Sequence, residues 1–337
     1  MANFWEKISQ NKKTARRGGD GVFFCLAPMI NVTDTAFRQI IAKYSRHGLA
    51  GGGPAVFWTE FVSADGLASE AGRDAMLKLL KFSKKEKPLV AQIFGAHPDK
   101  IQKACEIISK LGFDGIDINM GCPDKDVVKQ GAGAALIKTP ALAREIIRAA
   151  HLGAPKLPIS VKTRIGYNTI EYKTWLVEIL QEDIAALTVH LRTKKEMSDV
   201  PAHWELAKDI VRTARKQKKD IVLIANGDIV TLTDGKEKAV KARFDGIMIG
   251  RGIFGNPWLF DTRKKKLPTP KEKLKALVEH TKLYEKLLSY RNFANMKKHF
   301  KAYVSGWEGA KDLRIELMNT NNGKDVEKVI REYLKKK

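Results

Sequence analysis

Residues 186–252 read ALTVHLRTKKEMSDVPAHWELAKDIVRTARKQKKDIVLIANGDIVTLTDGKEKAVKARFDGIMIGRG, and this stretch decides the fold. It holds three short apolar runs, and stretches with helical spacing of apolar side chains separate them. Strands that alternate with helices in this way are typical of repeated βα units on a parallel sheet. Five similar runs precede this stretch, so that the predicted strands are 22–26, 55–59, 89–94, 115–119, 159–163, 186–190, 221–226 and 246–249.

The number of predicted strands indicates a closed barrel. The first strand leads into Ala27-Pro28-Met29, whereas a doubly wound sheet would show the glycine pattern G-x-G-x-x-G at this point. We therefore predict an α/β fold, a (β/α)₈ TIM barrel over residues 21–262. The chain of 337 residues is longer than one such barrel needs, which leaves room for a small second domain.

The sequence changes character after Phe260. A basic linker with two prolines covers residues 263–270, and the region that follows shows only helical spacing. We predict a small helical domain over residues 271–337, of a size that would depend on the barrel for stability. Three cations, Lys297, Lys298 and Arg314, lie between its apolar faces, and they are either RNA contacts or an ordinary solvated surface.

The composition is strongly basic. The chain has 61 Lys and Arg against 38 Asp and Glu, a formal net charge of +23. Such a charge attracts polyanions, so RNA, DNA and an anionic membrane are candidate partners. The alternative is that basic proteins are common in the cell of origin.

The N-terminal residues 1–20 form a basic extension without a long apolar run, which argues against a signal peptide or a membrane span. We expect a cytoplasmic protein, and the extension is either an added RNA contact or a disordered tail. The three cysteines include no C-x-x-C pair, so neither a disulfide framework nor a metal site is expected.

Polar side chains stand where the predicted strands end, which is where barrel enzymes place their reactive groups. One such residue would be ordinary packing, but a succession on one face indicates a site. The succession consists of Gln92, Asn119, Lys162, Arg164, His190, Arg192, Asn226, Gly227 and Asp228.

Two glycine turns close the last two strands, Asn226-Gly227-Asp228 and Gly250-Arg251-Gly252. Their backbone N–H groups can approach a phosphate, and a short helix predicted over residues 253–260 would direct its N-terminus at it. Arg251 adds positive charge. The turns therefore predict a phosphorylated ligand, although a pair of ordinary glycine turns is the alternative.

Lys162 and His190 are suited to a flavin. A cation near the N1 and C2 carbonyl edge of the isoalloxazine stabilises the anionic reduced ring, and an imidazole can donate a second hydrogen bond there. Ala27-Pro28-Met29 would supply a small, rigid surface with a polarizable side chain against the ring, unless it is simply a strand that ends in proline.

Cys122 is the most informative residue of the chain. It lies between Gly121, which allows a sharp turn, and Pro123, which restricts that turn. A free thiol is mostly protonated at neutral pH, so Cys122 can act as a general acid, although without its surrounding motif a buried inert thiol would be preferred. Cys25 and Cys105 lie in apolar patterns and are interpreted as packing residues.

Over the whole barrel the sequence resembles the tRNA-dihydrouridine synthases of bacterial type. The most specific element is Asn119-Met120-Gly121-Cys122-Pro123. Around it, in order, lie the segments 26–29, 32–34, 37–38, 59–60, 92–95, 131–136, 161–164, 189–193, 226–229 and 249–252. The helical tail is in keeping with the RNA-binding helical domain of these enzymes.

The resemblance implies an FMN enzyme that takes hydride from NADPH and reduces the C5=C6 bond of a uridine in tRNA. Hydride would pass from flavin N5 to C6, and Cys122 would protonate C5. The base would leave its stack to reach the barrel, while the basic surface holds phosphates.

The resemblance also assigns residues. Flavin contacts fall on Gln92, Lys162, His190, Asn226, Gly227, Asp228, Gly250 and Arg251, and the pocket where flavin and uracil meet falls on Asn119 and Arg192. To these we add, from the residues themselves, Ala27, Pro28 and Met29 as flavin contacts and Arg164, Lys297, Lys298 and Arg314 as substrate contacts. We expect a monomer without an obligate protein partner.

One segment departs from the family pattern. Leu191 follows His190, and the residues after it lack the usual glutamine-containing stretch, so substrate positioning would differ here. Two other functions compete with the main prediction. They are an FMN barrel that reduces a small molecule of the dihydropyrimidine or enone type, and a tRNA-binding protein without activity.

Overall fold

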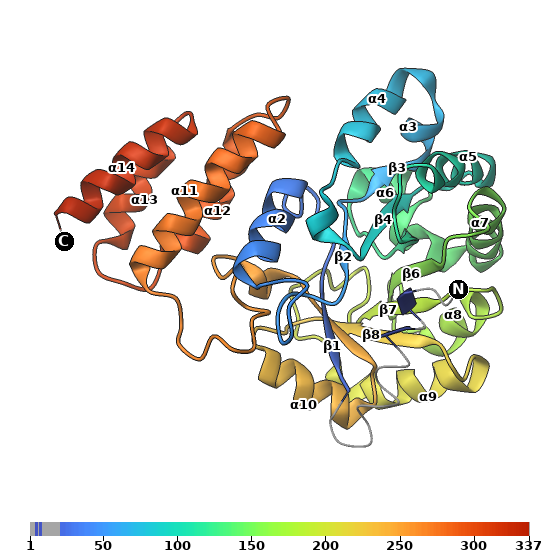
Figure 1. Ribbon diagram of the computed structural model, residues 1–337. Coiled ribbons are helices and arrows are strands. Elements are labelled where there is room, and N and C mark those ends of the chain that lie inside the picture. The colour runs from blue at the N-terminus through green and yellow to red at the C-terminus, as the bar shows by residue number, and fades with distance from the viewer. Residues whose placement is uncertain (1–3, 6, 9–20, 337) are drawn as a thin grey trace. The chain divides into compact units, whose positions relative to one another are not determined.

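The computed structural model describes residues 4, 5, 7, 8 and 21–336. Within this part of the chain one parallel sheet has the strand order β1-β9-β8-β7-β6-β5-β4-β2, with β3 also paired to β4 (Figure 1). The strands are β1 (Phe23–Leu26), β2 (Phe57–Trp58), β3 (Val62–Ser63), β4 (Leu89–Phe94), β5 (Gly115–Met120), β6 (Ile159–Arg164), β7 (Ala186–His190), β8 (Val222–Asn226) and β9 (Gly246–Ile249).

All eight predicted strands are present. The second is shortened to β2, which pairs with the first half of β4, and the additional strand β3, beyond the predicted bounds, pairs with its second half. A parallel bridge between Cys25 and Val56 brings the two edges of the sheet together, and the backbone N–H of Leu26 donates to the Val56 carbonyl at 3.4 Å. The predicted (β/α)₈ barrel is therefore confirmed.

Helices follow the strands along the chain and bury apolar side chains. In α5 (Pro98–Ser109), for example, Ile101, Ala104, Cys105 and Ile108 are buried. None of the helices in the described part of the chain combines the length and the apolar character that crossing a membrane requires. The other helical segments of the barrel unit are α3 (Ala64–Ala68), α4 (Glu70–Leu79), α6 (Lys125–Lys129), η2 (Gly133–Lys138), α7 (Pro140–Gly153), α8 (Tyr172–Ile179), η3 (Trp204–Leu206), α9 (Ala207–Gln217) and α10 (Leu232–Ala242).

The N-terminal extension contributes to the barrel core. Trp5 is only 1% exposed and packs with Cys25, Trp58 and Val90, and its ring centroid lies 6.0 Å from that of Trp58. Phe4 packs against the same cluster. Neither an RNA contact nor a disordered tail, the two alternatives for the extension, accounts for these buried aromatic side chains at its start. The basic residues 12, 13, 16 and 17 of the extension lie outside the described residues.

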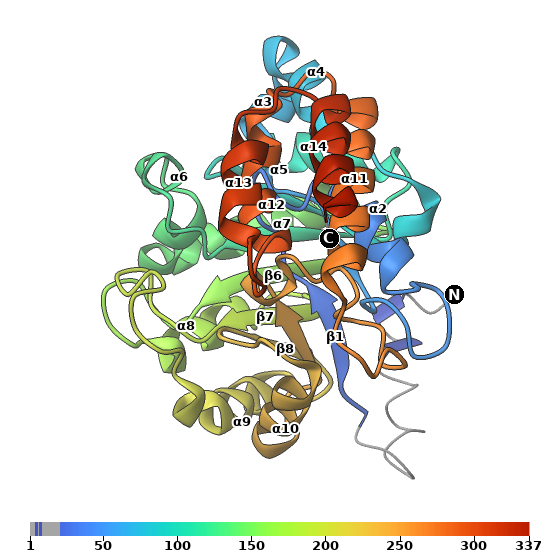
Figure 2. The ribbon, with the colours of Figure 1, turned by 90° about the vertical axis from the view of Figure 1, so that its left-hand side faces the viewer.

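A second compact unit comprises residues 251–337 together with two earlier segments, 31–54 and 82–86. The earlier segments supply α2 (Thr35–Tyr44) and η1 (Lys84–Glu86), and α2 runs beside α11 in Figures 1 and 2. The C-terminal segment supplies η4 (Arg251–Ile253), α11 (Pro270–Leu287), α12 (Ala294–Tyr303), α13 (Ala310–Met318) and α14 (Gly323–Lys335). The predicted helical region is thus present, and the structure adds the two earlier segments to it.

A buried ion pair ties the short segment at residue 86 to α2. The Arg38 guanidinium donates to Glu86 at 2.6 Å, and both side chains are fully buried. Thr35 donates its hydroxyl to the same carboxylate at 2.7 Å, and Arg38 also donates to the Thr33 carbonyl at 2.6 Å. The carboxylate is therefore fully partnered, as a buried charge must be to remain stable.

The predicted helix over residues 253–260 is wrong. The chain makes the single 3₁₀ turn η4 and then a series of turns up to Phe260. Gly255 has a φ of +70°, and a Cβ at this position would lie 2.1 Å from the Ala302 carbonyl oxygen of α12. Pro257 cannot donate a helical hydrogen bond. The apolar pattern of this segment arises from packing rather than from a helix.

Two neutral histidines in the second unit make its stability dependent on pH. His280 and His299 are buried beside Phe37, with 4.8 Å between the two imidazole centroids. Burial lowers the pKa of His280 well below its usual value and that of His299 to about 3. Unfolded chains bind these protons near pH 6.5, so stability is complete above that pH and falls as the pH drops below it.

We expect urea unfolding to show a loss of roughly 1–2 kcal/mol between pH 7.5 and pH 6 from these two groups. A variant with His280→Leu and His299→Leu should lack most of this acid slope. An unchanged slope in that variant would assign the acid sensitivity to other groups.

Candidate active site

The strand register brings the predicted polar residues together at the carboxyl ends of β5 to β8. Asn119 pairs with Lys162 across β5 and β6. Arg164 then pairs with His190, and His190 pairs with Asn226 on β8. Neighbours in register on parallel strands lie side by side, so these residues form a row across one end of the barrel.

Lys162 is the central cation of this row. Its ammonium donates to Asn226 Oδ1 at 3.3 Å, and Asn226 Nδ2 in turn donates to the Met248 carbonyl at 2.8 Å. Removal of water and the positive charge of Arg164 lower the pKa of Lys162 to about 8. An anionic ligand edge beside it would relieve both effects, because an opposite charge favours the charged form.

His190 is oriented by Arg192. One guanidinium nitrogen of Arg192 lies 3.2 Å from His190 Nε2, while other nitrogens donate to the Val200 carbonyl at 2.6 Å and to the Asp228 carboxylate. A guanidinium can only donate, so Nε2 accepts and Nδ1 carries the proton of the neutral ring. Arg192 is 2% exposed. Arg192 is therefore buried beside His190, and its predicted contact with the substrate stays a prediction.

The glycine turns lie close to neighbouring side chains at the ends of the last strands. Gly227 has a φ of +134°, and a Cβ there would lie 2.8 Å from the Ala202 Cβ and 3.3 Å from the His190 ring. A Cβ at Gly250 would touch Ala27 and Met29, each at 3.7 Å. The predicted small surface after β1 therefore lies next to the second glycine turn. Arg251, which follows it, is exposed and is the first residue of the C-terminal segment of the second unit.

Cys122 lies on a loop whose backbone N–H and carbonyl groups are hydrogen-bonded to Asn119 and Ala134. The backbone N–H groups of Gly121 and Cys122 donate to Asn119 Oδ1 at 3.1 and 2.8 Å, and the Cys122 carbonyl accepts from the Ala134 N–H at 3.0 Å. The side chain is half-buried, whereas Cys25 and Cys105 are buried. Burial raises the pKa of the Cys122 thiol, so the thiol is protonated at neutral pH.

Arg164 anchors two loops of the site. It donates to the Gly121 carbonyl at 2.8 Å, and to the Thr193 and Met197 carbonyls at 2.9 and 3.0 Å. Loss of water around the guanidinium lowers the pKa of Arg164 to about 10. These bonds link the Cys122 loop to the segment after His190, and the predicted substrate contact of Arg164 stays a prediction.

The segment after His190, which departs from the family pattern, has its own internal bonds. Glu196 accepts from the Thr193 N–H at 2.7 Å and pairs with His203 Nε2 at 2.9 Å. The Glu196 carboxylate raises the pKa of His203. Hydrogen bonds between its own residues therefore hold this loop together.

The three predicted RNA contacts of the helical region bond to backbone carbonyls of the second unit. Lys297 donates to Met318 at 2.8 Å, Arg314 donates to Val304 at 2.8 Å, and Lys298 donates to Asn31. The Met318 and Val304 carbonyls lie at helix C-terminal ends, where a carbonyl has no helical partner. Their role in RNA binding remains a prediction.

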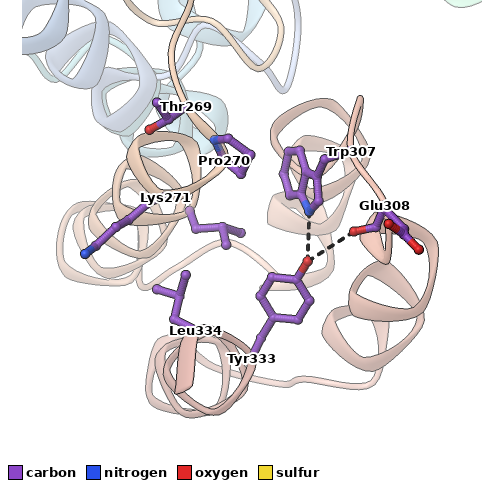
Figure 3. A pocket seen from close by; sticks show the side chains of 8 residues that line it. Thr269, Pro270, Lys271, Trp307, Glu308, Tyr333 and Leu334 are labelled. Atoms are coloured by element: carbon purple, nitrogen blue, oxygen red, sulfur yellow. Dashed lines mark hydrogen bonds between the residues drawn. The ribbon is translucent and has the colours of Figure 1, made fainter. Parts of the chain in front are cut away.

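The second unit also has an open pocket with a volume of about 560 Å³ (Figure 3). Trp307 donates its indole N–H to the Tyr333 hydroxyl at 3.0 Å, and that hydroxyl donates to the Glu308 carbonyl at 3.4 Å. The Lys273 ammonium lies 5.9 Å from the Trp307 ring centroid. The remaining lining comes from Thr269, Pro270, Lys271, Leu274 and Leu334.

Sequence reasoning missed Asp117. Its carboxylate is fully buried and accepts from Gln92 Nε2 at 2.7 Å and from the Ser160 hydroxyl at 2.6 Å. Burial raises its pKa to about 6. A signal was available, because Asp117 and Asn119 are two residues apart on one strand and therefore face the same side of the sheet.

Solved structures with a similar fold agree with the barrel. A histamine dehydrogenase from Rhizobium sp. 4-9 has a TM-score of 0.53 at 12% identity and covers 77% of this chain and 48% of that chain. TcOYE with pHBA has a TM-score of 0.50 at 11% identity and covers 73% of this chain and 90% of that chain. These likenesses concern the fold alone.

Two bacterial proteins are similar to this chain in sequence over nearly its whole length. A "Probable tRNA-dihydrouridine synthase" of Staphylococcus aureus (strain COL) is 40% identical over 334 residues, 98% of this chain and 95% of the relative. A "Probable tRNA-dihydrouridine synthase 2" of Bacillus subtilis (strain 168) is 39% identical over 337 residues, 99% of this chain and 97% of the relative. The family model for dihydrouridine synthase (Dus) matches residues 25–337, and the chain therefore belongs to the dihydrouridine synthase (Dus) family.

Proposed function

We propose that this protein is a tRNA-dihydrouridine synthase that holds FMN in its barrel and uses NADPH to reduce a uridine of tRNA. The observation that carries the proposal is the half-buried Cys122 thiol on its bonded loop, at the same barrel end as the Lys162 ammonium. Relatives named tRNA-dihydrouridine synthases match the chain over nearly their whole length, which supports the substrate.

The donor set fits a flavin. Lys162 and the neutral His190 lie near one another through Asn226, and the nearby turns at Gly227 and Gly250 present backbone without a side chain. A cationic donor and a neutral N–H donor suit the pyrimidine edge of an isoalloxazine, where negative charge develops on reduction. Lys162 and His190 would hold this edge, and the glycine turns would admit the phosphate.

Cys122 provides the proton. A flavin held by Lys162 and His190 would supply hydride chemistry toward C6 of the uracil, and the Cys122 thiol would give its proton to C5, so that the C5=C6 bond gains one hydride and one proton. The thiolate that remains takes up a proton from solvent before the next turnover. A raised pKa keeps the thiol protonated at neutral pH, which a proton donor requires.

Binding of tRNA should depend strongly on salt because the chain carries a net charge of +23. If the protein contacts 6–10 phosphates, affinity is expected to fall by about 10³- to 10⁵-fold between 50 and 200 mM salt. Fluorescence anisotropy of a labelled tRNA over this range would measure the slope. A flat dependence would contradict a binding mode based on phosphates.

The test of the proposed function uses purified protein, NADPH and an unmodified tRNA transcript. A visible flavin absorbance band and dihydrouridine at defined tRNA positions are expected. Reduction of an enone or a dihydropyrimidine precursor without reaction on tRNA would support the small-molecule alternative. Binding of tRNA with no dihydrouridine formed would support the non-catalytic one.

A further inference from the structure

A chain of polar side chains crosses the barrel interior and ends at the loop of Cys122. It starts where the Ser160 hydroxyl donates to Asp117 Oδ1 at 2.6 Å. Gln92 Nε2 donates to Asp117 Oδ2 at 2.7 Å, and Gln92 Oε1 accepts from Asn119 Nδ2 at 3.2 Å. Asn119 Oδ1 then accepts from the Cys122 N–H at 2.8 Å. Asp117 and Gln92 are fully buried and Asn119 nearly so.

The donor and acceptor directions in this hydrogen-bonded network depend on Asp117. The two ends of a Gln or Asn amide have nearly the same shape, so their orientation is set by the partners. An ionised carboxylate only accepts, which turns Gln92 Nε2 toward Asp117 and Gln92 Oε1 toward Asn119. Asn119 must then donate to Gln92, and its oxygen is left to hold the backbone of the Cys122 loop.

We propose that Asp117 is a positioning residue for Cys122, because it fixes the orientation of the Gln92 and Asn119 amides and thereby the loop that carries the thiol. The inference rests on the proposed function, since it concerns the thiol that donates the proton there. Burying a carboxylate costs free energy that well-packed apolar residues would not. The raised pKa of Asp117, about 6, reflects this cost. A role in setting direction accounts for its presence.

The alkylation rate of Cys122 reports the state of its loop without any RNA or NADPH. The purified flavin-loaded protein is treated with iodoacetamide over a range of pH, and modification is followed by intact mass. Cys25 and Cys105 are buried, and burial raises the pKa of each, so they stay silent. Loss of the bond from the Cys122 N–H would expose the thiol and bring its pKa down toward the usual value.

The first pair of variants tests whether position 117 needs a hydrogen-bond acceptor or only a side chain of similar size. Asp117→Leu removes the acceptor, and alkylation at pH 7.5 is expected to rise about 3- to 10-fold, since one unit of pKa changes the thiolate fraction tenfold. Asp117→Asn can still offer its oxygen to Gln92 while its NH₂ donates to the Ser160 hydroxyl. This variant should stay within about twofold of the parent protein.

The second pair of variants moves the carboxylate from position 117 to position 119, next to the Cys122 loop. Asn119→Asp places an oxygen against Gln92 Oε1 where a donor is needed, so alkylation is expected to rise about 3- to 10-fold at pH 7.5. Combining it with Asp117→Asn reverses Gln92, which then accepts from position 117 and donates to position 119. Every group is partnered again, and the double variant should return to within about twofold of the parent protein.

The proposal is overturned if Asp117→Leu, with native thermal unfolding and flavin content, alkylates at the parental rate. It is also overturned if the double variant reacts as fast as Asn119→Asp alone. Should Asp117→Leu fail to fold, the Asn119→Asp pair decides by itself. Failure of the proposed function would appear separately, as absent dihydrouridine with these alkylation rates unaffected.

Discussion

Replacing Cys122 by alanine is expected to lower the rate of uridine reduction in tRNA by about 10²- to 10⁴-fold, the usual contribution of a positioned general acid. The hydride would still be available, but C5 would have to take its proton from water. Lys162 and His190 are untouched by the change, so flavin should remain bound. Single-turnover oxidation of the reduced, tRNA-bound enzyme measures the effect directly.

A matched control is Cys105→Ala, which removes a thiol buried in α5. It should keep the rate of uridine reduction, although the smaller side chain will cost some stability. A rate that is unchanged in Cys122→Ala would remove this residue from the reaction and assign the proton to another donor.

Replacing Lys162 by methionine is expected to weaken flavin binding by about 10- to 100-fold, since a hydrogen bond from a charged group contributes about 1.5–3 kcal/mol. The parent protein should also lose affinity as the pH rises through about 8, where the lowered pKa of Lys162 lets the ammonium lose its proton. Lys162→Met should not show this pH dependence. Fluorescence titration of the apoprotein with FMN measures both effects.

Lys129→Met is the control for this substitution, because Lys129 is an exposed lysine at the end of α6. Its flavin affinity should match that of the parent protein. An affinity in Lys162→Met equal to that of the control would place the flavin elsewhere than at Lys162.

Patterns of local origin were predictable from the sequence. The eight strands followed from short apolar runs between helical stretches, and all eight are present. The loop of Cys122 followed from glycine and proline beside the thiol, since these residues restrict the backbone wherever they occur. The row of polar residues followed from one rule, that parallel strands end at the same side of a barrel.

Where the sequence was misleading, long-range contacts were the cause. Turns replace the helix predicted over residues 253–260, where Gly255 has a φ of +70° and lies so close to the Ala302 carbonyl of α12 that no Cβ would fit. Trp5 lies in a basic segment, and only the folded barrel shows that this side chain fills its core. Tyr44 of α2 donates its hydroxyl to Glu279 of α11, 235 residues later, so no local pattern reveals that α2 belongs with the helical unit.

The sequence by itself determined the barrel, the family and the chemical types of the site residues, because periodicity and short motifs are local properties of the chain. Only the tertiary structure decided which polar groups face one another. Gln92 on β4 meets Asp117 and Asn119 on the adjacent strand β5, at distances of 2.7 and 3.2 Å. Such distances follow from strand register, which is set by the packing of the whole sheet.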